Sequence, residues 1–456
     1  MFKRILIANR GEIAVRIIRA CREMGIRTVA VYSQADRNAV HVGLADEAVC
    51  IGKAEASDSY LNMERIISAA IAVGAEAIHP GFGFLSENAE FVQMCEQHHI
   101  TFIGPSSELI SRMGNKSEAK KTMKQAGVPV VPGTEEPVYD LEEAKREAER
   151  IGYPVMIKAS SGGGGKGMRI ARSREEFAVS FQAAQQESIR AFADDSMYLE
   201  RYVQNPRHVE VQIMADKYGQ VIQLGERDCS IQRRHQKMIE ESPSPALTDE
   251  IRKKIRSTAV QAAKVVNYES AGTIEFLLDD SGEFFFMEMN TRIQVEHPVS
   301  ELISGVDLIR EQIMVAAGEA LSVAQEDILF RGHAIECRIN AEDPIRGFLP
   351  CPGTITHLHL PGGNGVRIDT AIYEGYQIPP NYDSMLVKVI TYDRDRKTAI
   401  RKMIRALDEM EIEGVETNLE FQYDILHQKD FQEGNFTTDF ICLLYTSPSP
   451  RDISGS

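Results

Sequence analysis

The sequence predicts a multidomain protein of mixed α/β and α+β class, and three observations support this prediction. The chain has 456 residues, about three times the ~150 residues of an ordinary domain. Apolar strand-like runs alternate with amphipathic helices over residues 1–114, which is typical of an open parallel α/β sheet. From about residue 330 to residue 441 the chain is rich in strands and turns. We therefore expect an N-terminal domain, a central domain over 115–329 and a strand-rich C-terminal domain.

Repeated strand–helix units predict the N-terminal domain. Residues 4–8 form an apolar strand, and residues 12–24 carry apolar side chains at helical spacing. Gly25 ends this helix before a second strand over 28–32. Further helices and strands are predicted over 65–73, 77–79, 91–98 and 101–103. Because a strand–helix–strand unit implies a right-handed parallel crossover, the strands should form one parallel sheet.

The central region contains a smaller α/β insert. Helices are expected over 141–151 and 175–191, and strands over 155–159 and 197–202. We predict that residues 131–204 form a flexible lid, followed by β alternation over 208–224. In the C-terminal domain a helix is expected over 396–410, whereas residues 442–456 lack periodicity and are interpreted as a non-native tail or a sign of truncation.

Composition excludes several classes of function. The formal charge of −16 argues against a nucleic-acid partner, although local basic groups can still bind a nucleotide or bicarbonate. Seven cysteines without CxxC spacing favour free thiols over a disulfide or zinc framework. The apolar run in MFKRILIANRGE is too short for a signal peptide, and no segment approaches the ~20 apolar residues of a membrane span. We therefore expect a cytoplasmic protein without a membrane partner.

The glycine-rich segment SSGGGGKGMRI follows the strand YPVMIKAS. It is not a Walker A loop, because Gly167 follows Lys166 where that loop requires Ser or Thr. Consecutive glycines let backbone N–H groups approach a phosphate closely and form an anion nest. The alternative is a plain flexible linker, but Lys158 and Lys166 favour phosphate binding.

In MEMNTRIQVEHP, polar residues occupy alternate positions from Glu288 to Glu296. Alternate residues share one face of an extended chain, so we predict a continuous polar face. A turn over 279–282 joins this segment to the strand that carries Glu275, and hairpin pairing would bring Glu275 near Glu288. Two buried carboxylates repel unless a cation lies between them, and Mg²⁺ prefers oxygen ligands, to which Asn290 could add one. The alternative is a solvated hairpin edge.

Basic residues lie beside these acids. Arg292 offers a planar fork to a planar oxyanion such as carbonate, and Glu296 beside it could act as a base, although an ordinary salt bridge is the alternative. Residues 233–237 read RRHQK, which by default is a solvated charge run. The flanking Ile231 and Met238 indicate instead that this segment packs against the body.

Eight motifs together resemble the biotin carboxylase family of ATP-grasp enzymes, over residues 1 to about 440: LIANRGEIAVRIIRA, HPGFGFLSEN, FIGP, MGNKSEAK, KASSGGGGKGMRI, ERDCSIQRRHQK, EMNTRIQVEHPVSE and ECRINAEDP. The resemblance implies an ATP-grasp fold with an N-terminal Rossmann-like domain and a C-terminal β-rich domain. It implies a ligase that uses ATP, Mg²⁺ or Mn²⁺ and bicarbonate to form carboxyphosphate and then carboxylate biotin on a carrier protein. This is the first half-reaction of acetyl-CoA carboxylase in fatty acid synthesis, upstream of carboxyltransferase subunits. The alternative is the corresponding part of a pyruvate or propionyl-CoA carboxylase.

The resemblance also implies roles for residues at matching positions. It assigns the ATP phosphates to Lys116, Lys158, Gly164 and Gly165. It assigns the adenine hinge to Glu200, Arg201 and Val203, with the nucleotide also near His208, Gln232 and His235. It assigns the metal to Glu275, Glu288 and Asn290, and bicarbonate to Lys237, Arg292, Gln294 and Val295. Glu296 would deprotonate bicarbonate, Arg338 would stabilise the enolate form of biotin, and the Phe82 ring would stack near biotin.

Three positions depart from the common family pattern. Phe82 replaces a tyrosine and Arg201 replaces a lysine. Arg19 and Glu23 match the residues of the family's homodimer interface, but Asn364 replaces a phenylalanine there, so the predicted homodimer has an altered contact. A non-catalytic ATP-binding relative and another ATP-grasp ligase are the competing classes. The RIQVEHP segment and Arg338 favour an active biotin carboxylase.

Overall fold

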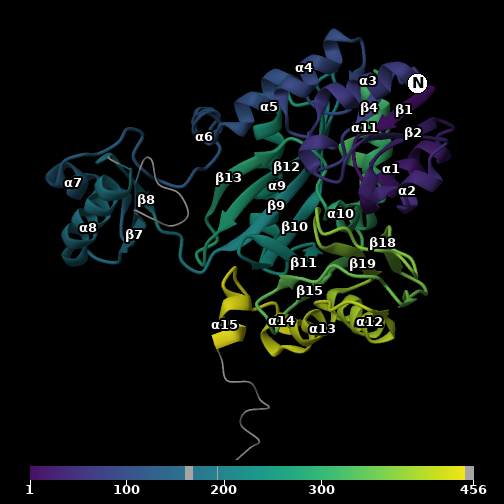
Figure 1. Cartoon of the computed structure of the whole chain (residues 1–456). Helices are drawn as coiled ribbons and strands as arrows, with labels where there is room; N and C mark the ends of the chain where they lie inside the picture. The colour runs from purple at the N-terminus through teal and green to yellow at the C-terminus, as the bar shows by residue number, and fades with distance from the viewer. Residues whose placement is uncertain (160–167, 193, 447–456) are drawn as a thin grey trace, which may run out of the picture.

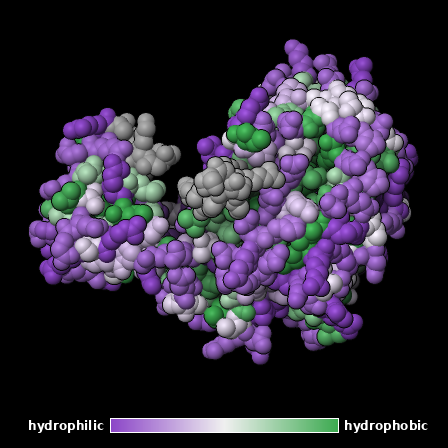
Figure 2. All heavy atoms as spheres, turned by 90° about the horizontal axis from the view of Figure 1, so that it is seen from below, coloured by the Kyte–Doolittle hydropathy of each residue, from purple (hydrophilic) through white to green (hydrophobic). Residues whose placement is uncertain are grey.

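The computed structural model describes residues 1–159, 168–192 and 194–446. Gly164, Gly165 and most of the predicted tail lie outside the described residues. Within the described part of the chain, no helix is long and apolar enough to cross a membrane. Figure 1 shows the N-terminal sheet and the central sheet in one body, with the lid projecting to one side beyond α6. Seen from below, the lid is a separate lobe and most of the visible surface is hydrophilic (Figure 2).

The N-terminal region forms the predicted parallel sheet, in the strand order β3-β2-β1-β4-β5. Its strands are β1 (Arg4–Ile7), β2 (Arg27–Ser33), β3 (Glu47–Gly52), β4 (Ala77–His79) and β5 (Thr101–Phe102). The helices are α1 (Gly11–Glu23), α2 (Val40–Leu44), α3 (Met63–Val73), α4 (Ala89–Gln97) and α5 (Ser107–Gly114). Helix α3 shows why these elements end where they do: the Asn62 side chain caps its first turn, and Gly74 at φ 64° ends it in the left-handed conformation.

The lid has its own sheet and its own apolar core. Strands β6 (Val155–Ala159), β7 (Met168–Ala171) and β8 (Met197–Arg201) form it in the order β7-β6-β8, next to α7 (Leu141–Ile151) and α8 (Arg174–Phe192). Phe177 and Phe181 are fully buried, and their rings stack with centroids 5.8 Å apart. Since this core is separate from the cores of the body, the lid can open locally without unfolding the rest.

We expect the substitution Phe177→Ala to destabilise the lid alone, by about 3–5 kcal/mol, because it leaves a cavity in a small core. Hydrogen exchange should accelerate at the lid amides while the central sheet keeps its protection. The control is Val179→Ala on the same helix, because Val179 is 72% exposed. Equal acceleration in the central sheet would contradict an independent lid core.

The central sheet has eight strands in the order β13-β12-β9-β10-β11-β14-β19-β18, and all neighbouring strands are antiparallel. They are β9 (Arg207–Ala215), β10 (Val221–Arg233), β11 (Gln236–Ser242), β12 (Ser270–Leu278), β13 (Phe284–Asn290), β14 (His333–Asn340), β18 (Val366–Thr370) and β19 (Met385–Asp393). The sheet therefore runs across the expected domain boundary near residue 330. Strands of the predicted C-terminal domain extend the sheet of the central domain directly.

Helices cover the central sheet and connect it to the other parts. They are α6 (Lys116–Gln125), α9 (Asp249–Val265), α10 (His297–Ser304), α11 (Leu308–Ala316), α12 (Arg396–Glu409), α13 (Leu419–His427), α14 (Lys429–Glu433) and α15 (Phe440–Thr446). Short strands β15 (Glu342–Asp343) and β16 (Leu349–Pro350) pair with each other, as do β17 (His357–His359) and β20 (Glu411–Glu413). Helix α12 packs against β14 and β19, which places the helices of the chain's last part on one face of the sheet (Figure 1).

The predicted extended face from Glu288 to Glu296 is wrong beyond Asn290. Strand β13 ends at Asn290, and α10 begins at His297 with Pro298 in its first turn. Ile293 and Gln294 are both buried although they are consecutive, which a two-sided pleat would not allow on a half-exposed strand. The polar side chains meet because the chain turns back toward the sheet, and not because they alternate.

Candidate active site

The hairpin that carries the predicted metal ligands forms as expected. In the register of β12 and β13, Glu275 lies directly opposite Glu288, so the two side chains share one face of the sheet. Asn290 Nδ2 donates to Glu275 Oε1 at 2.7 Å, and Lys116 Nζ, at the start of α6, lies 2.9 Å from Glu288 Oε2. Glu288 is partly exposed, whereas Glu275 is buried. The solvated-edge alternative is therefore excluded for Glu275.

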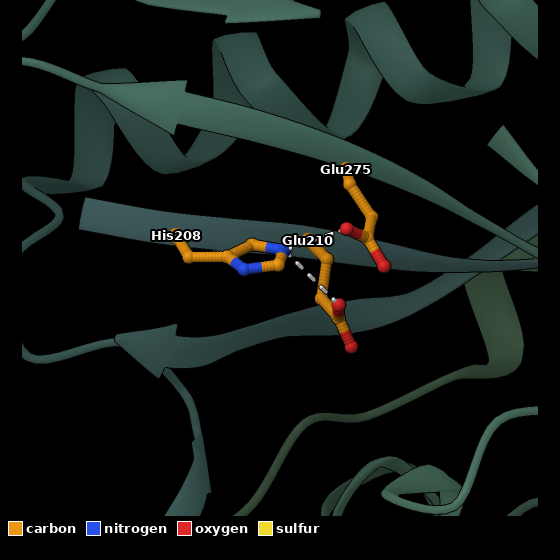
Figure 3. Close-up of side chains that lie close together, drawn as sticks. All are labelled: His208, Glu210 and Glu275. Atoms are coloured by element: carbon orange, nitrogen blue, oxygen red, sulfur yellow. Dashed lines mark ion pairs between the residues drawn. The ribbon is translucent and has the colours of Figure 1, made fainter. Parts of the chain in front are cut away.

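His208 and Glu210 on β9 point toward Glu275 on the neighbouring strand (Figure 3). His208 Nε2 lies 2.8 Å from Glu275 Oε2 and 3.6 Å from Glu210 Oε2. Burial disfavours a charged imidazole, but the two carboxylates outweigh it and raise the pKa of His208 above its ordinary value. One potential ligand atom from each of the three residues lies within 4.8 Å of the other two. The carboxylate oxygens of Glu210 and Glu275 are ligands of the kind a divalent cation prefers, whereas His208, with its raised pKa, acts as a hydrogen-bond partner of Glu275 and not as a ligand.

Lys237 on β11 stands among three carboxylates. Its Nζ lies 2.6 Å from Glu210, 3.1 Å from Glu275 and 2.6 Å from Glu296. Burial favours the neutral amine, but the three acids raise its pKa well above the ordinary value, so the charge persists. The segment RRHQK is thus not wholly a solvated charge run, since its last residue enters the site.

Glu296 is buried at the N-terminal end of α10 between two cations. Arg338 Nη2 on β14 donates to Glu296 Oε2 at 2.9 Å, opposite the contact with Lys237. Burial would raise the pKa of Glu296, but Lys237 and Arg338 hold it well below the ordinary value. Glu296 is therefore ionised and able to accept a proton, and Lys237 and Arg338 concentrate positive charge beside it.

Arg292 connects the site to the N-terminal region. Its Nε lies 2.9 Å from Glu87 Oε2, and its Nη2 donates to Asn290 Oδ1 at 3.2 Å. The salt-bridge alternative is therefore present in the structure, with a partner far away in sequence. Glu87 was not among the residues the sequence analysis singled out, since nothing in the local pattern of HPGFGFLSEN distinguishes it.

Arg227 on β10 is the functional residue that sequence reasoning missed most clearly. It is fully buried, and its guanidinium donates to Glu210 Oε1 at 2.6 Å and to Gln294 Oε1 at 2.7 Å. Further bonds reach Gln212, Thr273 and Ser300. Because Arg227 occupies the Gln294 carbonyl, the Gln294 amide must donate on its other side, where it contacts Glu275 Oε1 at 2.8 Å. The density of polar residues in ERDCSIQ was the available sequence signal.

We expect Arg227→Met to lower the free energy of unfolding by about 3–5 kcal/mol, because Glu210 would lose a buried counterion. Urea unfolding of this variant measures the loss. Arg310→Met, at an exposed position of α11, is the control and should change stability by less than about 0.5 kcal/mol. A loss no larger than that of the control would show that Arg227 does not hold the site together.

The residues assigned to the nucleotide lie between the lid and the central sheet. Glu200 on β8 forms ion pairs with Lys158 on β6 and, at 2.7 Å, with Lys120 on α6. Arg201 pairs with Glu283 at 3.0 Å, beyond the lid. Lys120 was not anticipated, although it lies one helical turn after Lys116.

The remaining residues predicted for the nucleotide and biotin lie in different surroundings. Val203 is buried, and Gln232 lies 3.4 Å from the His208 ring and so joins the site. His235 is exposed at the β10–β11 turn with φ 64°, outside the buried cluster. The Phe82 ring packs against the core between the N-terminal and central regions.

Three family descriptions match successive parts of the chain. They are "Biotin carboxylase, N-terminal domain" over residues 1–110, "Carbamoyl-phosphate synthase L chain, ATP binding domain" over 115–324 and "Biotin carboxylase C-terminal domain" over 336–442. The chain is 57% identical to biotin carboxylase 1 of Bacillus subtilis (strain 168) over 442 residues, which cover 97% of this chain and 98% of the relative. It is 54% identical to a pyruvate carboxylase subunit from Methanothermobacter thermautotrophicus over 441 residues, which cover 97% of this chain and 90% of that one.

A solved structure gives the same fold. The biotin carboxylase domain dimer of 2-oxoglutarate carboxylase from Hydrogenobacter thermophilus, in complex with MgADP, ADP and bicarbonate, is 52% identical with a TM-score of 0.87. The match covers 98% of this chain and 100% of that domain. Together with the buried cluster of acids and cations described above, these matches show that the chain belongs to the biotin carboxylase family of ATP-dependent ligases.

Proposed function

We propose that this protein carboxylates biotin on a biotin carboxyl carrier protein, as the first half-reaction of an acetyl-CoA carboxylase that supplies malonyl-CoA for fatty acid synthesis. The observation that supports the chemistry best is Glu296, an ionised carboxylate held between Lys237 and Arg338. This arrangement places a base beside two fixed cations. The choice of acetyl-CoA carboxylase as the enzyme complex rests on the motif resemblance over residues 1 to about 440.

Glu275, Glu288 and Asn290 would hold Mg²⁺ or Mn²⁺, since their side chains share one face of the β12–β13 hairpin and the Asn290 amide contacts Glu275. The cation supplies charge neutralisation for the ATP phosphates when bound. Lys116, at the edge of this face, would bind phosphate oxygens and would exchange its contact with Glu288 for them. Lys158 and the glycine loop would cover the phosphates from the lid. Closing the lid would exclude water from the labile carboxyphosphate.

Bicarbonate would bind beside Glu296, to which Lys237 and Arg338 donate. Lys237 and Arg292 supply positive charge, and the Gln294 amide is oriented as a donor by Arg227. The Val295 backbone is fixed because its carbonyl accepts from Lys388 Nζ at 2.7 Å. Glu296 would accept the bicarbonate proton, which makes the carbonate oxygen a nucleophile toward the terminal phosphate of ATP. The resulting carboxyphosphate would break down to CO₂ and phosphate, and that phosphate can accept the ureido N–H proton of biotin. Arg338 would stabilise the negative oxygen of the biotin enolate as it attacks the CO₂, because a guanidinium retains its charge.

The acceptor complex is tested by offering the protein two biotinylated carriers, one from an acetyl-CoA carboxylase and one from a pyruvate carboxylase. Labelled bicarbonate and MgATP measure carboxylation of each carrier. Faster transfer to the first supports the proposal, and faster transfer to the second supports the pyruvate or propionyl-CoA alternative, which the Methanothermobacter relative favours. Failure of both carriers and of free biotin to stimulate ATP turnover would indicate a non-catalytic relative.

We also propose a homodimer, as in the Hydrogenobacter domain structure. Arg19 and Glu23 are exposed on α1 and available for such an interface. Asn364, which replaces the phenylalanine of the family interface, lies in the loop before β18. Sedimentation of the protein over a range of concentrations tests this assembly. A cytoplasmic location stays a prediction from the sequence.

A further inference from the structure

Two buried glutamates lie side by side behind Arg338, and the chemistry proposed above does not use them. Glu240 on β11 lies directly opposite Glu336 on β14 in the antiparallel register. Both are fully buried. Arg338 follows Glu336 on the same face of β14, forms an ion pair with Glu240, and lies opposite Lys388 on β19. We call Glu240 and Glu336 the carboxyl pair.

Glu336 has no hydrogen-bond partner for either oxygen among the residues the structure describes. A buried carboxylate without donors is costly, because it has lost its hydration and gained nothing in exchange. Holding a proton is the usual way in which such a group lowers this cost. The cross-strand position next to Glu240 adds repulsion, since two adjacent carboxyl groups do not both ionise easily.

The charged groups that face Glu336 do not remove this cost. They are Lys388 from β19, Glu240 from β11, Arg338 from β14 and Glu296 from α10. Burial is the largest effect and raises the pKa of Glu336 well above its ordinary value, despite Lys388. Burial likewise raises the pKa of Glu240 to about 7, despite the contact with Arg338.

Lys388 cannot fully compensate Glu336, because its charge is already engaged. Its Nζ lies 3.2 Å from Glu12 Oε1 and 3.6 Å from Asp369 Oδ2, and it donates to the Val295 carbonyl. His297, the other titratable group of α10 near Lys388, is held neutral because burial and the surrounding cations lower its pKa. The carboxyl pair therefore has no unengaged cation beside it among these neighbours.

We propose that the carboxyl pair holds one proton between Glu240 and Glu336, and that this proton leaves the positive charge of Arg338 available to the substrate oxygen. The role of Arg338 toward the substrate rests on the function proposed above. With the proton present, Arg338 faces two carboxylates, one of the pair and Glu296. Without it, three carboxylates would surround one guanidinium and weaken its field at the substrate. Glu240 and Glu336 are positioning residues, since they act through Arg338.

The next residue on β11 provides a matched contrast. Glu241 is also fully buried, but it points to the opposite side and accepts from His333 Nε2 at 2.6 Å and from Arg396 Nε at 2.6 Å. These partners outweigh burial and lower the pKa of Glu241 to about 2. Glu241 is thus an ionised buried glutamate, and its replacement should have the opposite effect from that of Glu336.

The first experiment detects the proton directly, without any assay of function. Infrared spectra of the protein labelled with ¹³C-glutamate should show the carbonyl band of a buried protonated carboxyl group at pH 7. Glu336→Gln should remove the part of the band that Glu336 contributes, because Glu240 then remains beside Arg338 as its counterion, and Glu241→Gln should leave the band unchanged. Absence of the band from the unaltered protein at pH 7 would overturn the proposal, whatever the variants do.

The second experiment follows stability with pH. In the folded protein the carboxyl pair keeps a proton that glutamates of the unfolded chain lose above pH ~4.3. The free energy of unfolding therefore falls as the pH rises from ~4.3 toward the pKa of the pair. Glu336→Gln should remove this fall, so the ratio of its folding constant to that of the unaltered protein should increase with pH, by up to about tenfold per pH unit. Glu241→Gln should be destabilised at neutral pH, and its deficit should shrink as pH falls from ~4.3 toward 2. A constant ratio for Glu336→Gln would contradict a retained proton.

The third experiment tests the effect on Arg338. Biotin carboxylation by the unaltered protein should fall at alkaline pH as the pair loses its proton, and in Glu336→Gln this alkaline fall should move up by about one pH unit or more. Bicarbonate-dependent ATP turnover without biotin should keep its pH profile. An equal change in both profiles would indicate a merely structural role. Loss of biotin carboxylation in the unaltered protein, with the infrared band present, would reject the proposed function and not the proton.

Discussion

The substitution Glu296→Ala is expected to abolish bicarbonate-dependent ATP hydrolysis, with a loss of about 10²–10⁴-fold, while nucleotide affinity survives. Glu296 is the carboxylate that Lys237 and Arg338 keep ionised, and it is therefore the group prepared to accept the bicarbonate proton. The residues assigned to ATP and to its metal lie elsewhere, with Lys116 on α6 and Glu288 on β13. Removing Glu296 leaves these two unaltered.

Steady-state ATPase assays with and without bicarbonate measure the bicarbonate-dependent hydrolysis, and titration with MgATP measures the nucleotide affinity. Glu296→Gln is the matched variant, since it keeps the volume and a hydrogen-bond acceptor but cannot take up the proton. Turnover close to that of the unaltered protein in either variant would show that another group is the base. A parallel loss of nucleotide affinity would indicate that Glu296 maintains the structure of the whole site.

The substitution Arg338→Gln is expected to lower biotin carboxylation by about 10²–10³-fold, and bicarbonate-dependent ATP cleavage by about tenfold. The larger effect is expected because a neutral amide cannot balance the negative charge of the biotin enolate. The smaller effect follows from the 2.9 Å contact with Glu296. Arg338 is one of two cations that lower the pKa of Glu296, so its loss raises that pKa. The acid limb of ATP cleavage should then move to higher pH.

Measuring both rates from pH 5 to pH 9 separates the two effects. Arg338→Lys is the control for charge alone, because lysine keeps the charge but not the planar fork. Equal losses of carboxylation and ATP cleavage would reject separate roles. Unfolding experiments accompany the assays, since removing one partner of a buried ion pair can cost about 3–5 kcal/mol.

Local periodicity predicted most of the regular elements. The α1 and α3 helices, the parallel strands β1, β2 and β4 and the lid elements were predicted to within a few residues, because each buries one stripe or one face against a neighbour. The proximity of Glu275 and Glu288 was also predicted from the turn at Asp279–Gly282, but their direct pairing depends on a register shift between Glu275 and Phe276, which the sequence did not indicate.

Prediction failed where distant segments decide the conformation. After Asn290 the alternation of residue types continues, but the chain leaves the sheet and Gln294 bonds to Arg227 on β10. No local sequence pattern indicates this change of direction. Arg292 likewise meets Glu87, which lies in the N-terminal region. Side-chain contacts of this kind depend on which elements are neighbours in space, and residue spacing along one segment holds no information about that.

The amino-acid sequence by itself determined most helices and strands and the family, because these follow from short-range spacing and from motifs; the residues it assigns to the nucleotide and bicarbonate stay predictions. Only the tertiary structure decided their protonation states. Glu240, Glu241 and Glu336 are the same type of residue. Glu240 and Glu336 face each other on two neighbouring strands, whereas Glu241 contacts His333 and Arg396. The physical reason is that desolvation and Coulomb interactions depend on neighbours brought together by the sheet, and so identical side chains differ in their tendency to keep a proton.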